Sequence, residues 1–117
     1  MERVIQRSDR SFPEKGGLMY TVVERRKVNA ERLQETIQRA QSEFFPQLKA
    51  APGFTGFYLV ADEANGVNTA VIVWESKAQA DAFEAENSRW MRTLDELGHP
   101  LQSDNRGETV ITVEARS

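Results

Sequence analysis

The chain of 117 residues lies within the usual size of one domain, so we expect one hydrophobic core and no second folding unit. Its 15 basic and 18 acidic side chains give a formal net charge of -3, which argues against a nucleic-acid partner. The absence of cysteine excludes disulfides, thiolate metal sites and cysteine nucleophiles. No apolar run approaches the roughly 20 residues that cross a bilayer, and the N-terminus lacks the apolar stretch of a signal peptide, so we expect no membrane contact and a cytoplasmic location.

The N-terminal residues 1–17 hold few large apolar side chains and end in two glycines, which is typical of a loosely held arm. The domain proper is expected over residues 18–117. A Tyr-Thr-Val-Val run predicts a first strand over residues 18–25. The charged run at its end is expected to face water, although Arg25 and Arg26 are also candidates for holding an anionic substrate.

A helix is predicted to begin after Asn29, whose side-chain oxygen can accept from the free amides of the first turn. Apolar residues then recur at intervals of three and four, which places them on one side of the helix: Leu33, Ile37, Ala40, Phe44 and Leu48. Pro46 lacks an amide proton, so this helix should kink or loosen near Phe45 and end before Pro52.

Two further strands are predicted over residues 54–61 and 67–74, joined by a tight reversal at Asn65–Gly66. Ser76, followed by Gln79 three residues later, forms a capping box that opens a second helical region.

The second helical region carries an apolar stripe in which Asn87 is the one polar member, and Gly98 is placed to end it. The stripe consists of Ala80, Phe83, Trp90, Met91, Leu94 and Leu97. A loop over residues 102–107 is expected to lead to the last strand, residues 109–115.

This order of elements predicts an α+β, ferredoxin-like βαββαβ fold, an antiparallel sheet with both helical regions on one face. The strands are apolar at both alternating positions, so both faces of the sheet should be covered. We therefore expect a homodimer in which the open faces of two sheets pack together, a dimeric α/β barrel. The alternative is that residues 1–17 fold over the open face.

Several short motifs resemble a known family: Pro52-Gly53-Phe54 before a strand, then Trp74-Glu75-Ser76-Lys77, then Phe83. Over residues 18–115 the chain resembles the antibiotic biosynthesis monooxygenase-like family of the dimeric α/β-barrel superfamily. Its members include cofactor-independent oxygenases of aromatic polyketides, quinol oxygenases and haem-degrading oxygenases. The haem-degrading branch needs a histidine where this chain has Asn87, and a carboxamide is a poor iron ligand, so we expect no haem, no metal and no other cofactor.

In this fold a small ligand would lie between the sheet and the helices. Strand alternation places Asn68, Ile72 and Trp74 on one face. The resemblance suggests Trp74 and Asn87 as catalytic residues. The expected substrate-binding residues are Asn68, Ile72, Phe83, Trp90 and Met91.

Each of these residues also has a purely structural interpretation. Trp74, Phe83 and Trp90 can simply fill the core, and Asn87 can bond a backbone group within the helix pair. His99 lies in a Gly-His-Pro turn and is expected at the surface. Two functions follow: a cofactor-independent monooxygenase-like enzyme acting on a small aromatic or quinol compound, or a non-catalytic small-ligand-binding or stress-associated dimer.

Overall fold

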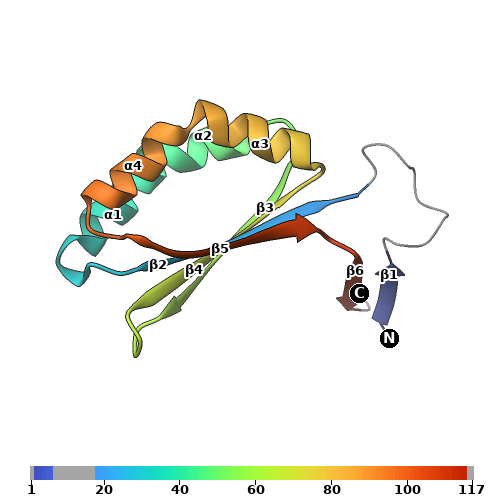
Figure 1. Ribbon diagram of the computed structural model, residues 1–117, viewed down its shortest axis with the longest axis horizontal. Coiled ribbons are helices and arrows are strands. Elements are labelled where there is room, and N and C mark those ends of the chain that lie inside the picture. Colours follow the sequence, from blue (N-terminus) through green and yellow to red (C-terminus); the bar gives the residue numbers. More distant parts are fainter. Residues whose placement is uncertain (1, 7–17, 116–117) are drawn as a thin grey trace.

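A four-stranded antiparallel sheet, in the order β3-β4-β2-β5, forms the body of the protein. The structure, a computed structural model, describes residues 2–6 and 18–115. The strands of this sheet are β2 (Tyr20–Lys27), β3 (Phe54–Asp62), β4 (Val67–Trp74) and β5 (Leu101–Glu108). The helices α1 (Leu33–Arg39), α2 (Phe45–Ala50), α3 (Lys77–Glu86) and α4 (Ser88–Glu96) all cover one face (Figure 1). The predicted α+β, ferredoxin-like βαββαβ architecture is confirmed.

The first helical region is interrupted where the sequence predicted a kink. The Asn29 side chain caps the short 3-10 turn η1 (Ala30–Arg32) by accepting the Glu31 amide at 3.2 Å. After α1 the chain widens into a π-helical segment, η2 (Ala40–Phe44), before α2 begins with Phe45 and Pro46. Pro46 has no N–H to donate and its ring crowds the preceding turn, so the regular helical ladder cannot run through this point.

The second helical region is also interrupted, at Asn87. Ser76 caps α3 by accepting the Gln79 amide at 3.3 Å, as its capping box predicts. Asn87 then ends α3 with its side-chain amide donating to the Phe83 carbonyl at 2.9 Å, and α4 starts at the next residue. Gly98 stops the region with a φ of 89°.

The prediction for the C-terminal part of the sheet is wrong. Residues 101–108, most of which were expected to be a loop, form β5, the fourth strand of the sheet, and pair with β2. The predicted last strand, residues 109–115, instead contributes β6 (Ile111–Ala115) to a separate two-stranded sheet with β1 (Glu2–Gln6). An edge strand needs few apolar residues, so the polar Gln-Ser-Asp-Asn sequence of β5 gave no strand signal.

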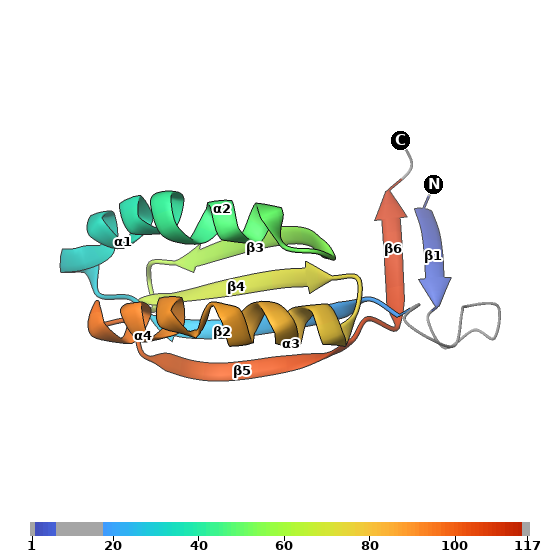
Figure 2. The ribbon, with the colours of Figure 1, turned by 90° about the horizontal axis from the view of Figure 1, so that it is seen from above.

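The β1–β6 pair lies beyond one end of the four-stranded sheet in both ribbon views (Figures 1 and 2). Residues 2–6 of the predicted N-terminal arm therefore pair with the C-terminal strand and do not cover the open face. The remaining residues of the arm, 1 and 7–17, lie outside the described residues.

The core lies between the sheet and the helices. Trp74 is 1% exposed, and its ring packs against Phe54 and Phe83 with centroids 5.9 and 5.1 Å away. The other large core side chains are Tyr20, Val22, Phe44, Leu48, Ile72, Trp90 and Leu97. Strand alternation leaves Val23 and Val71, which face each other across β2 and β4, on the open face.

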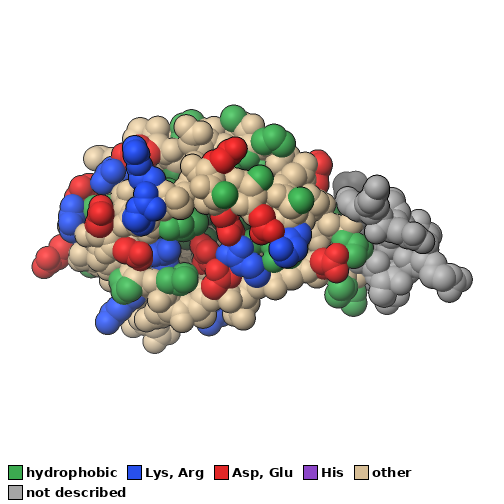
Figure 3. All heavy atoms as spheres, turned by 45° about the horizontal axis from the view of Figure 1, so that its top comes forward, with side chains coloured by type: hydrophobic (Ala, Val, Ile, Leu, Met, Phe, Trp, Pro, Cys, Tyr) green, Lys and Arg blue, Asp and Glu red, His purple; other side chains and the backbone are tan. Residues whose placement is uncertain are grey.

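Acidic and basic side chains are interspersed on the face shown in Figure 3. Pairs such as Arg39–Glu43, with 2.8 Å between Nε and Oε2, lie on the helix surface, where each contributes little to stability. Among the described residues, no helix is long and apolar enough to span a membrane.

Candidate functional site

A cavity of about 340 Å³ lies between the sheet and the helices. Small side chains leave this space open: Ala70 on β4 and Ala40 on η2 both line it. Its volume is at the lower end of the range for small-molecule sites, so a ligand of one or two fused rings would fill it.

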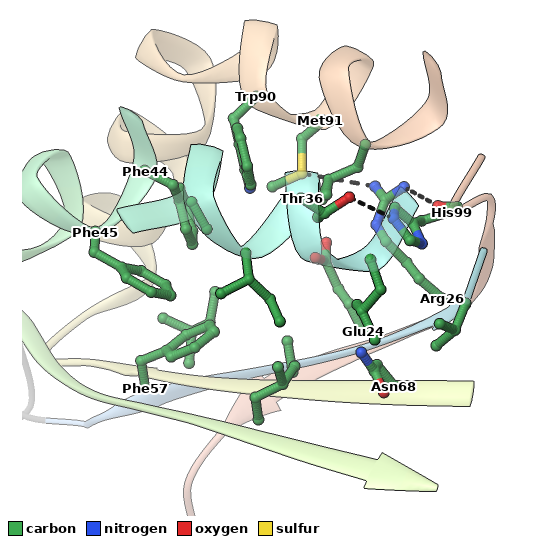
Figure 4. Close-up of a pocket in the computed structure, with 18 of the residues that line it drawn as sticks. Glu24, Arg26, Thr36, Phe44, Phe45, Phe57, Asn68, Trp90, Met91 and His99 are labelled. Atoms are coloured by element: carbon green, nitrogen blue, oxygen red, sulfur yellow. Dashed lines mark hydrogen bonds between the residues drawn. The ribbon is translucent and has the colours of Figure 1, made fainter. Parts of the chain in front are cut away.

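One end of the cavity is aromatic (Figure 4). The rings of Phe44 and Trp90 stack with centroids 5.3 Å apart and planes inclined by 8°. Phe57 on β3 closes the floor and meets Phe44 edge to face, with centroids 6.0 Å apart. A flat aromatic ligand could therefore stack on the ring faces or contact the ring edges at this end of the cavity.

The opposite end of the cavity is polar, and strand β2 supplies its floor (Figure 4). Tyr20, Val22, Glu24 and Arg26 alternate along β2, so the two charged side chains continue the buried face of the strand. In the register of β2 with β4, Arg26 lies opposite Asn68 and Glu24 lies opposite Ala70. The two charged side chains and the Asn68 carboxamide therefore lie on the same face of the sheet, next to the small side chain of Ala70.

Arg26 is held in place by its terminal nitrogens. Nη1 donates to Asp95 Oδ1 at 2.9 Å and to the His99 carbonyl at 2.8 Å, and Nη2 lies 3.7 Å from Met91 Sδ. The side chain is 12% exposed. Its Nε–H is buried and has no acceptor within the part of the chain that the structure describes. An unpaired buried donor costs about 1–3 kcal/mol, and more when it is charged, so this nitrogen is the most unusual atom of the site.

Glu24 is the carboxylate of the polar end. Its side chain is 11% exposed, and Oε2 accepts from Arg106 Nη2 at 3.3 Å. Burial raises the pKa of Glu24, and the neighbouring carboxylates of Asp104 and Glu84 raise it further against the opposing effect of Arg26 and Arg106. A carboxylate that protonates more readily than usual is suited to accepting a proton from a ligand.

His99 joins the polar end to helix α1, and it is buried rather than at the surface, contrary to the prediction: it is 5% exposed. Its Nδ1 accepts the Asn29 amide at 3.1 Å and lies 3.3 Å from the Lys27 carbonyl oxygen, and its Nε2 lies 2.7 Å from Thr36 Oγ1. The Asn29 contact, which is the shorter of the two at Nδ1, places the proton of the neutral ring on Nε2. Thr36 in turn donates to the Arg32 carbonyl at 2.9 Å. Burial lowers the pKa of His99, and Arg26 and Arg32 add to this effect against the opposing Lys27 carbonyl, which favours the neutral ring.

No protein-family model and no curated protein matches the sequence. Solved structures do match. A conserved protein from Methanosarcina mazei Go1 has a TM-score of 0.66 and 17% identity, covering 79% of this chain and 93% of its own. A candidate antibiotic biosynthesis monooxygenase from Nitrosomonas europaea has a TM-score of 0.61 and 12% identity, with 79% and 88% covered. A monooxygenase of Streptomyces coelicolor, solved with the ligand nanaomycin D, has a TM-score of 0.60 and 13% identity, with 86% and 89% covered.

The chain has the antibiotic biosynthesis monooxygenase fold. The resemblance that the Pro-Gly-Phe and Trp-Glu-Ser motifs predicted is therefore confirmed for the fold. At identities of 12–17%, the three matches show shared architecture and leave substrate and activity to be argued from the site.

Within the antibiotic biosynthesis monooxygenase fold, the predicted site residues fall into two groups. Asn68, Ile72, Trp90 and Met91 line the cavity. Phe83, Trp74 and Asn87 are not part of its lining. The expected pocket against Trp74 is filled by the rings of Phe54 and Phe83, and the Asn87 side chain bonds a backbone carbonyl, which is its structural interpretation.

Most of the polar end, namely Glu24, Thr36 and His99, was not predicted from the sequence, and Arg26 was predicted only as an alternative. The sequence did contain a signal for Glu24 and Arg26, namely their alternation with buried strand residues. The alternation that buries Tyr20 and Val22 continues to Glu24 and Arg26, but the charged run suggested that the strand had reached solvent. Among the described residues, no three acidic or histidine side chains gather as metal ligands would.

Proposed function

We propose that the chain is a cofactor-independent monooxygenase-like enzyme that acts on a small aromatic or quinol compound. The observation that carries this proposal is a mostly apolar cavity whose charged and hydrogen-bonding groups gather at one end, opposite stacked aromatic rings. Such a cavity would hold a flat ring system in one orientation, with its oxygen substituent at the polar end. The fold that the chain shares with proteins named as monooxygenases supports the same reading.

The reaction needs dioxygen as its second substrate. One oxygen atom enters the ring as a carbonyl oxygen, the other leaves as water, and the aromatic compound supplies all the electrons. An electron-rich phenolate or quinolate is needed for this, and the apolar walls would keep water away from the reacting carbon.

Oxygen uptake tests the proposal. The purified protein should consume dioxygen above the uncatalysed rate with 1-naphthol, forming 1,4-naphthoquinone and water, and with 1,4-dihydroxynaphthalene, forming 2-hydroxy-1,4-naphthoquinone and water. Ala70→Leu places a larger side chain in the cavity and should abolish the uptake, whereas Ala82→Leu on the exposed side of α3 should leave it unchanged. No uptake with any of these compounds would contradict the proposal.

A second candidate is a small-ligand-binding protein without catalysis. Its support is that His99 uses both ring nitrogens within the protein, so it has no free nitrogen to act on a ligand. Binding of naphthols that Ala70→Leu abolishes, with no uptake of oxygen, would favour this function over the enzyme.

We also propose that a second copy covers the open face of the sheet by sheet-to-sheet packing. Val23, Val71 and Tyr58 occupy adjacent positions there across three strands, and Tyr58 is 61% exposed. Sedimentation should find a dimer at micromolar concentration and a monomer for Val71→Lys, with Gln41→Lys on the helical side as the control. A wild-type monomer would contradict this assembly. The cytoplasmic location expected from the sequence stays a prediction.

A further inference from the structure

Strands β1 and β6 lie outside the βαββαβ unit, which β2 to β5 complete. They pair with each other in a register that places Val4 opposite Val113, and we call this pair the β1–β6 ribbon. Among the described elements, neither strand packs extensively on the four-stranded sheet or on a helix. A two-stranded ribbon is marginally stable at best in water, because it has no third strand or helix against which to bury its apolar side chains. The ribbon therefore requires another surface to cover it.

The side chains of β6 show which face of the ribbon needs that cover. Ile111 and Val113 alternate with Thr112, so they lie on one face of the strand. They are 53% and 50% exposed, and Val110, which precedes the strand, is also half-exposed. An antiparallel strand that is apolar on one face normally packs that face against other apolar groups. The Ile111 and Val113 side of the ribbon is therefore an apolar surface that the described part of the chain leaves open.

Thr109 fixes the place where the chain leaves the sheet for the ribbon. Its amide donates to the Met19 carbonyl at 2.8 Å, and its hydroxyl oxygen lies 2.6 Å from that of Thr21. Thr21 lies between Tyr20 and Val22, whose side chains are buried under the helices, so Thr21 is on the open face. The ribbon accordingly lies beyond the end of the sheet and on the side away from the helices (Figure 1), and its strands run across the direction of the sheet strands (Figure 2).

The open face is low where it meets the ribbon. The strand register places Gly56, Val73, Thr21 and Gly107 side by side across β3, β4, β2 and β5. Two of these four residues have no side chain, and the position of a Cβ at Gly107 is open space among the described residues. A second copy that packs on the open face can therefore come close to the sheet beside the ribbon.

The proposed sheet-to-sheet contact needs more surface than the open face offers. The strands of the sheet have eight or nine residues each. At about 4.8 Å between strands and about 3.4 Å per residue, four such strands present a face of about 500 Å². Each partner of a standard stable interface buries about 800 Å². The ribbon adjoins the open face and supplies exposed apolar surface, so a second copy is the partner that fits it.

We infer that the Ile111 and Val113 side of each β1–β6 ribbon packs on the second copy, beside the sheet-to-sheet contact. This ribbon contact rests on the proposed assembly and extends it. In a dimer with two-fold symmetry, each copy gives its ribbon to the other and receives one in return. The two ribbons then cover apolar side chains that a monomer leaves in water, and the pairing of β1 with β6 is stable only in the dimer.

Amide hydrogen exchange tests this dependence without a change in the ribbon. Val71→Lys lies on the open face of β4 and is expected to give a monomer. The β6 amides that bond β1 should exchange at least about tenfold faster in this variant than in the wild-type dimer, while the amides between β2 and β5 should keep their protection. Gln41→Lys on the helical side is the control and should match the wild type at both places. Protected β6 amides in the monomer would mean that the chain covers its own ribbon, and would overturn the inference.

Sedimentation equilibrium adds a test on the ribbon itself. Val113→Lys should raise the dissociation constant of the dimer at least about tenfold, whereas Thr112→Lys, on the other face of the same strand, should change it by less than about twofold. Equal effects of the two substitutions, or none from either, would overturn the inference. A dimer that Val113→Lys dissociates and Val71→Lys leaves intact would count against the sheet-to-sheet packing alone. A dimer that only Val71→Lys dissociates would count against the ribbon contact alone, and a wild-type monomer would contradict both.

Discussion

Glu24 on β2 and Asp104 on β5 lie directly opposite each other in the register of the two strands. Like charges at paired positions of an antiparallel sheet normally destabilise it. Arg106 offsets the repulsion: its Nη2 lies 2.7 Å from Asp104 Oδ2 and 3.3 Å from Glu24 Oε2, and its Nη1 lies 2.8 Å from Glu84. The most polar strand of the sheet is thus attached to both its neighbour β2 and the helix α3 by one guanidinium.

Glu24→Gln should make the protein more stable at neutral pH. The pKa of Glu24 is raised by burial, so the folded chain binds a proton on this carboxyl more readily than the unfolded chain does. That advantage is present at low pH and is lost as the pH rises through the folded pKa, after which the buried charge opposes folding. Thermal unfolding should show the variant above the wild type at pH 7, with the difference shrinking on acidification through the carboxyl range. A variant less stable than the wild type at pH 7 would contradict the assignment.

His99 should make stability fall as the solution becomes mildly acidic. Its pKa is lowered mainly by burial, so the unfolded chain takes up the proton at a higher pH than the folded chain. The stability that the neutral ring contributes is complete above a pH of about 6.5 and is lost below it. Denaturant unfolding at pH 7.5 and 5.5 should show a larger decrease for the wild type than for His99→Gln. Equal decreases would mean that the folded ring accepts a proton as readily as the unfolded one.

Trp74→Ala should act on stability rather than on the ligand site. The ring is 1% exposed and packed against Phe54 and Phe83, so its removal should cost about 3–5 kcal/mol of unfolding free energy. The more conservative Trp74→Phe should keep naphthol affinity within about twofold, because Trp74 does not line the cavity. Equilibrium unfolding and a binding titration on the same samples separate the two effects. A selective loss of binding in Trp74→Phe, at unchanged stability, would show that the cavity reaches this residue.

Gly53→Ala tests the turn that leads into β3. Gly53 has a φ of 83°, which costs other residues about 1–2 kcal/mol, and an added methyl group would overlap the side-chain amide of Gln79. The double variant with Gln79→Ala removes the overlap and keeps the backbone strain, so it should recover only part of the lost stability. Full recovery, measured by chemical denaturation, would assign the whole cost to the contact.

The order of the elements was predictable from the sequence because its signals are local. The Asn29 and Ser76 caps, Pro46 and Gly98 each act within a few residues, and each predicted boundary is found in the structure. The strand β5 was missed because its pairing with β2 and the Arg106 contacts depend on residues far away in the chain.

The candidate site was only half predictable for a related reason. Alternation along β4 correctly placed Asn68 and Ile72 together with the helix-facing side chains, since a strand fixes which face a residue occupies. Burial of His99 could not be read from its turn, because its partners Asn29 and Thr36 are more than 60 residues away, at separations of 70 and 63. The predicted pocket against Trp74 is filled because the rings of Phe54 and Phe83 pack on it, and the spacing of residues in the sequence does not reveal such packing.

Binding of an aromatic hydroxyl compound in the cavity is tested most directly by the NMR signals of the two tryptophan side chains. Trp90 lines the cavity and stacks on Phe44, whereas Trp74 lies in the core outside the cavity lining. In a ¹⁵N-labelled sample titrated with 1-naphthol, the indole N–H signal of Trp90 should shift until binding saturates, while that of Trp74 should stay close to its starting position. A shift of Trp74 with Trp90 unmoved, or no shift of either at saturating naphthol, would contradict binding in this cavity.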